Sequence, residues 1–95
     1  MAAVTLTEEA PLDELKTQLW LDGVAKLQQE GLVRWKGFLN MKDIPHRGVL
    51  QGTYELYSVS AGDLWDEDPR RTEIVLIGRS LDEAMLRRGL TAARA

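Results

Sequence analysis

Cysteine is absent from this 95-residue sequence, and histidine occurs once, as His46. Without thiols the chain forms no disulfide, builds no thiolate zinc site and offers no cysteine nucleophile. One imidazole does not complete a closed zinc site either, and His46 follows a predicted turn at residues 43–45. We therefore interpret His46 as an exposed or turn-associated side chain, and we predict no metal site in the chain.

The sequence also lacks the glycine-rich loops that bind nucleotide phosphates. None of its eight glycines falls into G-x-x-x-x-G-K-[ST] or G-x-G-x-x-G, the spacings that let backbone N–H groups surround phosphate. A strand followed by a helix is predicted near the C-terminus, but its connection at residues 78–80 is too short for either motif. We interpret the helix start beside Arg79 as an ordinary capped N-terminus, and we predict no cofactor-binding residue.

Long apolar runs and a basic surplus are missing as well. No stretch approaches the ~20 apolar residues that cross a bilayer, and the N-terminus lacks the pattern of a signal peptide. The formal net charge is −3, which argues against nucleic acid as the main partner, because such binding needs concentrated lysine and arginine. We expect a cytoplasmic chain that binds neither a membrane nor a nucleic acid.

Acidic residues gather in a polar segment, residues 61–71, which is predicted to be a loop. Its acids do not follow the spacing of a calcium-binding EF-hand, and a solvated loop is the usual meaning of such a cluster. Paired-carboxylate catalysis needs acids in contrasting, partly buried environments, so no catalytic residue is predicted here. The Arg70-Arg71 pair is interpreted as solvated or as contacting a partner. The four acids are Asp63, Asp66, Glu67 and Asp68.

The sequence does contain apolar segments sized for one small domain, residues 1–95. Strands are predicted at residues 4–7, 33–39, 47–51, 53–59 and 73–77, and helices are predicted to begin at Pro11 and at Ser80. The order β-α-β-β-β-β-α predicts an α+β fold of two layers. We expect a mainly antiparallel sheet with the helices packed on one face.

The two predicted helices each have an apolar stripe. Helical spacing in the first, which Gly31 is expected to end, predicts burial of Leu12, Leu15, Leu19, Val24 and Leu27. The second is predicted to start at a capping box formed by Ser80 and Glu83. Its expected buried residues are Leu81, Met85, Leu86 and Leu90.

The predicted strands differ in pattern. Alternation at residues 33–39 places Val33, Trp35 and Leu39 on one face. The other face of that strand receives Arg34, Lys36 and Phe38. Residues 74–77 form an unbroken apolar run, which is typical of a central strand covered on both faces.

Several of these segments occur together in one known family. They are residues 33–38 (VRWKGF), 49–52 (VLQG), 54–57 (YELY), Trp65, residues 69–72 (PRRT) and residues 74–83 (IVLIGRSLDE). In this order, and over nearly the whole chain, the sequence resembles the C-terminal domain of the CobW family of GTPase metallochaperones. The Leu-Gln-Gly and Glu-Leu-Tyr pieces resemble the eukaryotic zinc-regulated GTPase metalloprotein activators more than the bacterial cobalt proteins.

The resemblance implies a two-domain parent protein. An N-terminal GTPase domain, absent from this chain, would hold GTP, magnesium and a cysteine-rich zinc motif, and the parent would be the GTPase. The C-terminal domain would be non-catalytic and would couple the GTPase domain to a client metalloprotein in zinc or cobalt delivery. Neither GTP hydrolysis nor the principal zinc site carries over to this chain, which has no P-loop and no cysteine.

A docking role needs an exposed surface, and large aromatic residues serve interfaces as well as cores. Our candidate partner-contact residues are Lys36, Phe38, Gln51, Tyr57 and Trp65. Strand-face packing remains the alternative for the aromatics, and a solvated face for Lys36 and Gln51. Two other functions stay open: a free-standing small-ligand or regulatory domain with a pocket between helix and sheet, and an RNA-binding sheet that uses Arg34 and Lys36.

Overall fold

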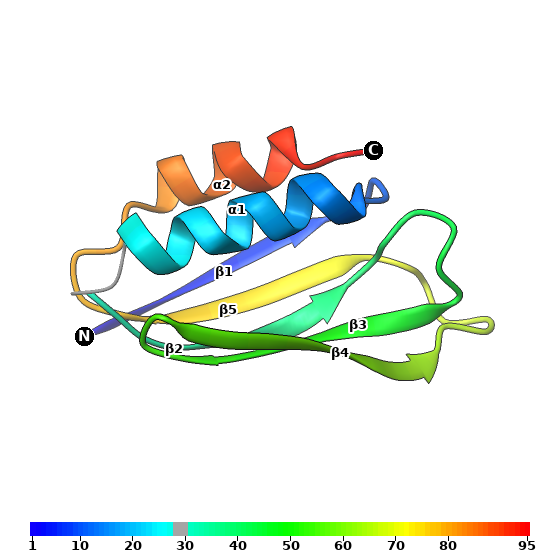
Figure 1. Ribbon diagram of the computed structural model, residues 1–95, viewed down its shortest axis with the longest axis horizontal. Coiled ribbons are helices and arrows are strands. Elements are labelled where there is room, and N and C mark those ends of the chain that lie inside the picture. The colour runs from blue at the N-terminus through cyan, green and yellow to red at the C-terminus, as the bar shows by residue number, and fades with distance from the viewer. Residues whose placement is uncertain (28–30) are drawn as a thin grey trace.

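Alternating burial along the strands separates a covered face of one sheet from an open face. The computed structural model describes residues 1–27 and 31–95, and within them two helices lie on one side of a five-stranded sheet (Figure 1). The elements are β1 (Ala2–Glu8), α1 (Glu14–Leu27), β2 (Leu32–Leu39), β3 (His46–Thr53), β4 (Leu56–Leu64), β5 (Thr72–Gly78) and α2 (Glu83–Ala92). The predicted α+β fold and its element order are confirmed.

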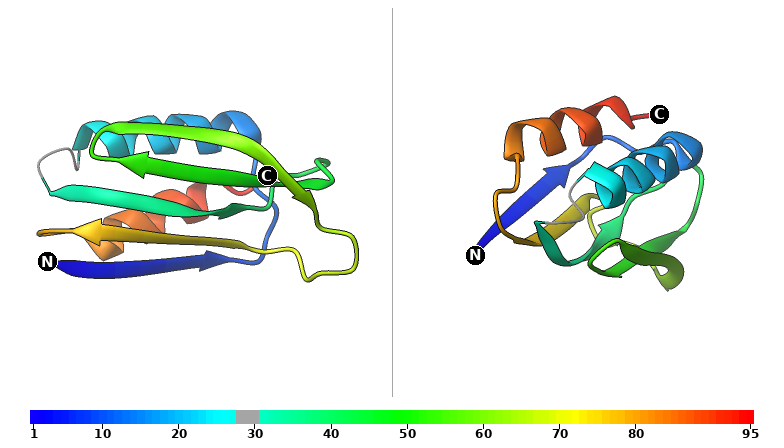
Figure 2. Two further views of the ribbon diagram at one scale, coloured as in Figure 1. Left: turned by 90° about the horizontal axis from the view of Figure 1, so that it is seen from below. Right: turned by 60° about the vertical axis from the view of Figure 1, so that its left-hand side comes forward.

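The sheet has the strand order β1-β5-β2-β3-β4, and all of its strand pairs are antiparallel. Figure 2 shows the sheet from the side away from the helices, with α1 and α2 behind it. The predicted packing of both helices on one face is therefore confirmed. No helix in the described part of the chain is long and apolar enough to cross a membrane.

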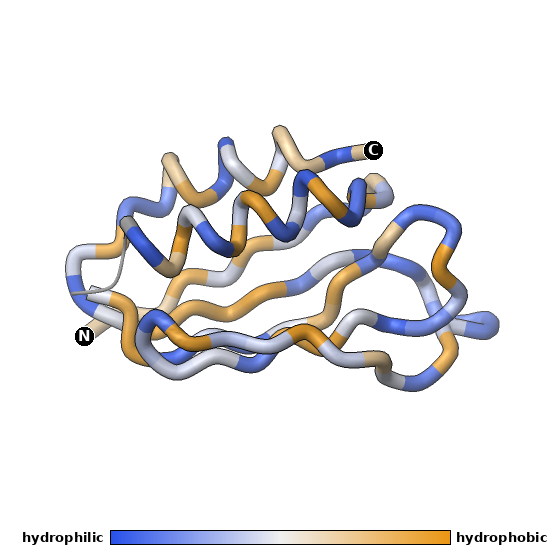
Figure 3. Tube along the Cα trace, in the orientation of Figure 1, coloured by the Kyte–Doolittle hydropathy of each residue, from blue (hydrophilic) through white to orange (hydrophobic). Residues whose placement is uncertain are grey.

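The core lies between the helices and the covered face of the sheet. Along β5, Thr72, Ile74, Leu76 and Gly78 are buried, while the residues between them are half-buried. Figure 3 shows apolar residues on both helices and along the strands, and residues 74–77 of β5 are apolar throughout. β5 lies inside the sheet between β1 and β2, so its prediction as a central strand is confirmed. The predicted coverage of both faces is wrong within residues 1–27 and 31–95, because both helices lie on one side and Val75 and Ile77 are half-buried.

The predicted buried face of α1 is partly wrong. Leu15 and Leu19 are 65% and 62% exposed, whereas Thr17, Leu21 and Val24 are buried. The error comes from Leu12, which is buried but precedes the helix and forms β-bridges with Met41 and Arg94. When Leu12 is counted as part of the helix, the apolar stripe is predicted on the wrong side of α1. The side chain of Leu27, and residues 28–30 before the predicted helix end at Gly31, lie outside the described part.

The start of α2 lies two residues beyond the predicted cap. The side chain of Asp82 accepts a hydrogen bond from the backbone N–H of Met85 at 3.1 Å, and Asp82 is the N-cap. Ser80 instead has a left-handed backbone with φ 52°, in the connection between β5 and the helix. Leu86 and Leu90 are buried as predicted, whereas Leu81 and Met85 are half-buried.

Two strands also depart from the predicted pattern. In β2 the buried residues are Leu32, Trp35 and Leu39, while Val33 is half-buried, because the pairing with β5 shifts register between Leu32 and Arg34. The strand predicted at 53–59 is displaced, since residues 54–55 form the hairpin turn and β4 runs from Leu56 to Leu64. Tyr54, with φ 55°, makes that turn. The predicted loop at 61–71 is therefore shorter than expected.

One contact explains why a glycine occupies position 52, near the end of β3. Trp35 pairs with Gly52, and a Cβ at position 52 would lie 2.2 Å from the indole Nε1. Gly52 does not have a positive φ, so the requirement is for space and not for backbone freedom. The Trp35 Nε1–H donates to the backbone oxygen of Tyr54 at 3.1 Å, which ties the indole to the hairpin turn.

We expect Gly52→Ala to lower the free energy of unfolding by about 1–3 kcal/mol, because the added methyl overpacks a filled site. Gly23→Ala is the matched control, since a Cβ at Gly23 meets nothing within 4 Å. In a helix interior this second change should stabilise by about 0.5–1 kcal/mol. Urea denaturation of both variants checks the pair, and equal midpoints would contradict the steric explanation.

Candidate functional site

The candidate site is the open face, which we define as the sheet surface opposite the helices. A groove of about 630 Å³ lies on it across β5, β2 and β3. The side chains on its floor alternate along each strand with the buried side chains. They are Arg34, Lys36, Phe38, Val49, Gln51, Glu73 and Val75.

Two cations at one end of the groove have neutral neighbours. Lys36 lies between Gln51 and Val75 in the strand register, and Arg34 lies between Thr53 and Ile77. Within residues 1–27 and 31–95 neither cation forms an ion pair. Both side chains are exposed, so this end of the groove presents positive charge to solvent.

The other end of the groove is apolar with a charged margin. Phe38 is 48% exposed and lies between Val49 and Glu73 in the register. The Arg47 guanidinium carbon is 5.7 Å from the centre of the Phe38 ring, which is within range of a cation–π contact. Glu73 accepts a hydrogen bond from Arg71 at 3.1 Å, so its charge is paired.

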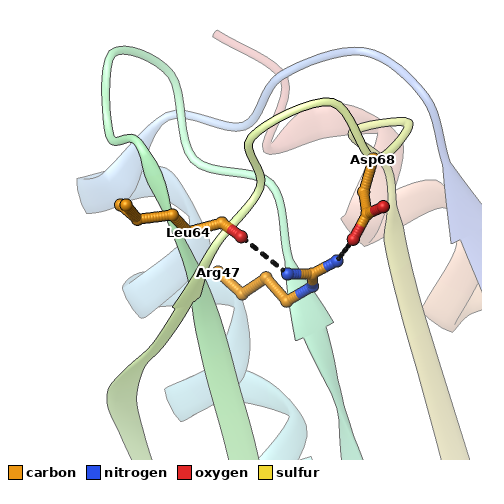
Figure 4. Close-up of polar contacts among 3 residues, drawn as sticks. All are labelled: Arg47, Leu64 and Asp68. Atoms are coloured by element: carbon orange, nitrogen blue, oxygen red, sulfur yellow. Dashed lines mark hydrogen bonds and ion pairs between the residues drawn. The ribbon is translucent and has the colours of Figure 1, made fainter.

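Beside the groove, Arg47 links the two ends of the segment that contains Trp65. It donates to the backbone oxygen of Leu64 at 3.0 Å and to the carboxylate of Asp68 at 2.7 Å (Figure 4). Its guanidinium carbon also lies 4.5 Å from the centre of the Trp65 ring. Asp68, one of the predicted solvated acids, is thus an ion-pair partner.

Trp65, a candidate contact residue for which packing was the alternative, is packed within the domain. The residue is 4% exposed, because Arg47 and Arg70 approach its ring at 4.5 and 5.8 Å from the ring centre. Burial of the indole removes apolar area from water, and the ring forms two cation–π contacts. Its side chain is therefore not available to a partner in this structure.

Arg70 also holds two loops together. It donates to the side-chain oxygen of Asn40 at 2.9 Å and to the backbone oxygens of Met41 and Ile44 at 2.9 and 2.6 Å. The interpretation of the Arg70-Arg71 pair as solvated or partner-contacting missed this role. Nothing in the local sequence signals it, because the three acceptors lie 26 to 30 residues away along the chain.

Tyr57, another predicted contact residue, faces the helices and not the groove. Its ring centre is 5.1 Å from that of Trp35, and its hydroxyl donates to the carboxylate of Asp22 on α1. Burial, this hydrogen bond and the negative charge of Asp22 raise the pKa of Tyr57 from 10.0 to about 12. The structure therefore brings together only Lys36, Phe38 and Gln51 of the five predicted contact residues, and sequence reasoning missed Val49 and Val75.

The Tyr57 hydroxyl should make stability depend on alkaline pH. Because its pKa is higher in the folded chain, its contribution is complete below pH 10 and is lost as the pH rises through about 12. We expect the unfolding free energy of the wild type to fall more steeply over this range than that of Tyr57→Phe. Tyr57→Phe should also remove a tyrosinate absorbance step near pH 12. Tyr54→Phe is the control and should retain both features; identical pH profiles for the wild type and Tyr57→Phe would refute the assignment.

Metal-ligating side chains are scattered over this structure. Within the described residues, no group of three or more histidine, cysteine, aspartate or glutamate side chains is placed to hold a metal ion. His46 lies at the start of β3, where its Nδ1 is 3.2 Å from the backbone oxygen of Arg47. The open face presents charged, hydrogen-bonding and apolar side chains.

Residues 1–94 match the family described as the cobalamin synthesis protein cobW C-terminal domain. Among solved structures, the Zn(II)-bound YjiA GTPase from E. coli is similar, with a TM-score of 0.95 and 23% sequence identity. A Zn(II)-bound triple mutant of YjiA gives the same values. The match covers 99% of this chain but only 30% of each of those chains. At this identity the structural likeness establishes the fold, while the family match extends over nearly every residue. The chain belongs to the CobW C-terminal domain family.

Proposed function

We propose that this chain is the non-catalytic interaction and regulatory domain of a CobW-type, GTP-dependent zinc or cobalt chaperone. It couples a GTPase domain to a client metalloprotein in the cytoplasm. The family assignment supports the parentage, and the solved relatives contain the same fold as 30% of a longer chain. GTP, magnesium and the transported metal then belong to the GTPase domain, in keeping with a sequence that has no P-loop and no cysteine.

The observation that carries this proposal is the uncovered face of the sheet. Both helices pack on one side, so the strands present a second broad surface with an aromatic ring and charged groups exposed on it. Aromatic side chains and polar groups around an apolar centre are typical of protein interfaces. Lys36, Phe38 and Gln51 are the predicted contact residues that lie on this surface.

Coupling predicts that the chain changes the catalytic rate of its GTPase domain. When the chain is added to that purified domain, we expect GTP turnover to change about fivefold or more, in the range of ordinary allosteric couplings. Phe38→Ala should abolish most of the change, because it removes the exposed apolar contact of the open face. GTP turnover measured against chain concentration checks both expectations.

Leu19→Ala is the matched control, since Leu19 is an exposed apolar residue on α1, away from the open face. It should leave the coupling intact. A turnover rate that is indifferent to the wild-type chain at saturating concentration would contradict the regulatory role. Equal losses in Phe38→Ala and Leu19→Ala would place the contact elsewhere than on the open face.

A further inference from the structure

The exposed side chains of β2 form a regular row on the open face. Arg34, Lys36 and Phe38 occupy alternate positions of the strand and point to the same side. Alternate residues of a strand lie about 6.6 Å apart. An extended peptide has the same repeat, so every second side chain of such a peptide can meet one member of this row.

The charge of the row is not neutralised by its surroundings. Two other arginines at the edge of the groove are paired, Arg47 with Asp68 at 2.7 Å and Arg71 with Glu73 at 3.1 Å. The residues directly opposite Arg34 and Lys36 are neutral, and Glu73 is diagonal to Lys36. No ion pair involves either cation in the part of the chain that the structure describes. The two cations lie side by side on one strand face of a chain whose formal net charge is −3.

We infer that this groove binds an extended acidic segment of a protein partner, with the pattern acid–x–acid–x–apolar. The two acids pair with Arg34 and Lys36, and the apolar side chain packs against Phe38 and Val49. This inference rests on the proposed function and names the chemistry of the partner segment. The segment lies along β2, with its alternate side chains directed into the groove.

Glu73 gives the groove a polarity that selects which end of the segment carries its acids. It lies next to Phe38 in the register, and among the described residues it is the one acid that lines the groove. Because Glu73 is already paired with Arg71, a third acid over Phe38 would gain no ion pair there and would place its charge beside an apolar ring. The apolar residue of the segment therefore belongs over Phe38 and the acids belong at the Arg34 end.

A polynucleotide fits the same groove less well. Single-stranded nucleic acids bind by stacking successive bases on several aromatic rings. Of the aromatic residues that line this groove, Phe38 is exposed and Trp35 is 1% exposed with its indole packed on the helix side. Two cations with one exposed ring match a short acidic peptide better than a chain of phosphates and bases.

The test uses fluorescence polarisation of labelled peptides against the 95-residue chain. A peptide with the core Asp-Ser-Asp-Ser-Leu should bind at low salt and weaken as salt is added, because exposed charge pairs are screened. A Lys-Ser-Lys-Ser-Leu peptide should not bind. The double variant Arg34→Glu/Lys36→Glu should weaken binding of the acidic peptide about tenfold or more and should acquire binding of the lysine peptide.

Arg88→Glu is the matched control, an exposed charge reversal on α2, and should leave both affinities unchanged. Because a charge reversal can disturb folding, Lys36→Gln is compared as a milder variant. It should weaken binding of the acidic peptide without creating binding of the lysine peptide. Absence of binding by the wild type, equal affinity for both peptides, or displacement of the acidic peptide by single-stranded RNA at equal concentration would each overturn the inference. Loss of peptide binding with intact regulation of GTP turnover would refute this inference and leave the proposed function standing.

Discussion

The packing of Trp35 against Gly52 is the contact on which the arrangement of β2, β3 and β4 depends. The indole is 1% exposed and fills the space that a side chain at position 52 would need. Its Nε1–H reaches the turn at Tyr54, and its ring packs on Tyr57 of β4. Since Trp35 occupies the helix side of β2, its neighbours in sequence must face the other way. One buried residue thus determines that Arg34 and Lys36 lie on the open face.

Tyr57 extends this constraint to the helical layer. Its hydroxyl donates to Asp22 of α1, so the β3–β4 ribbon is joined to the helix by a polar contact as well as by packing. On the other side of the sheet, the described residues form no helical layer. The charges on that side fall into two groups. Arg47 and Arg71 are paired with acids from nearby segments, whereas Arg34 and Lys36 have neutral cross-strand neighbours. Arg47 therefore holds the segment around Trp65 in place, whereas Arg34 and Lys36 remain exposed to solvent.

The sequence was sufficient to predict the element order and the open face of β2, because both follow from local periodicity. Prediction failed where a distant contact overrides the local pattern. Leu12 is buried by β-bridges and not by helical packing, which misplaced the stripe of α1. Trp65 is covered by two arginines, of which Arg47 is 18 positions away in the chain. Of the candidate site, the row on β2 was predictable, whereas Val49 and Val75 required the strand order that places β2 between β3 and β5.

A fold can be kept while its exposed surfaces change, and this chain illustrates the physical reason. At 23% identity to YjiA the fold is retained with a TM-score of 0.95, since volume and polarity at buried positions suffice to specify the packing of a small core. The exposed positions of the sheet face are under no such packing constraint, because neither helix touches them. Exposed residues such as Arg34, Lys36 and Phe38 can therefore vary without cost to the core, and in our proposal they are the residues that contact the partner. Knowledge of the fold alone does not identify the partner, because buried residues specify the fold and exposed side chains make the contacts with a partner.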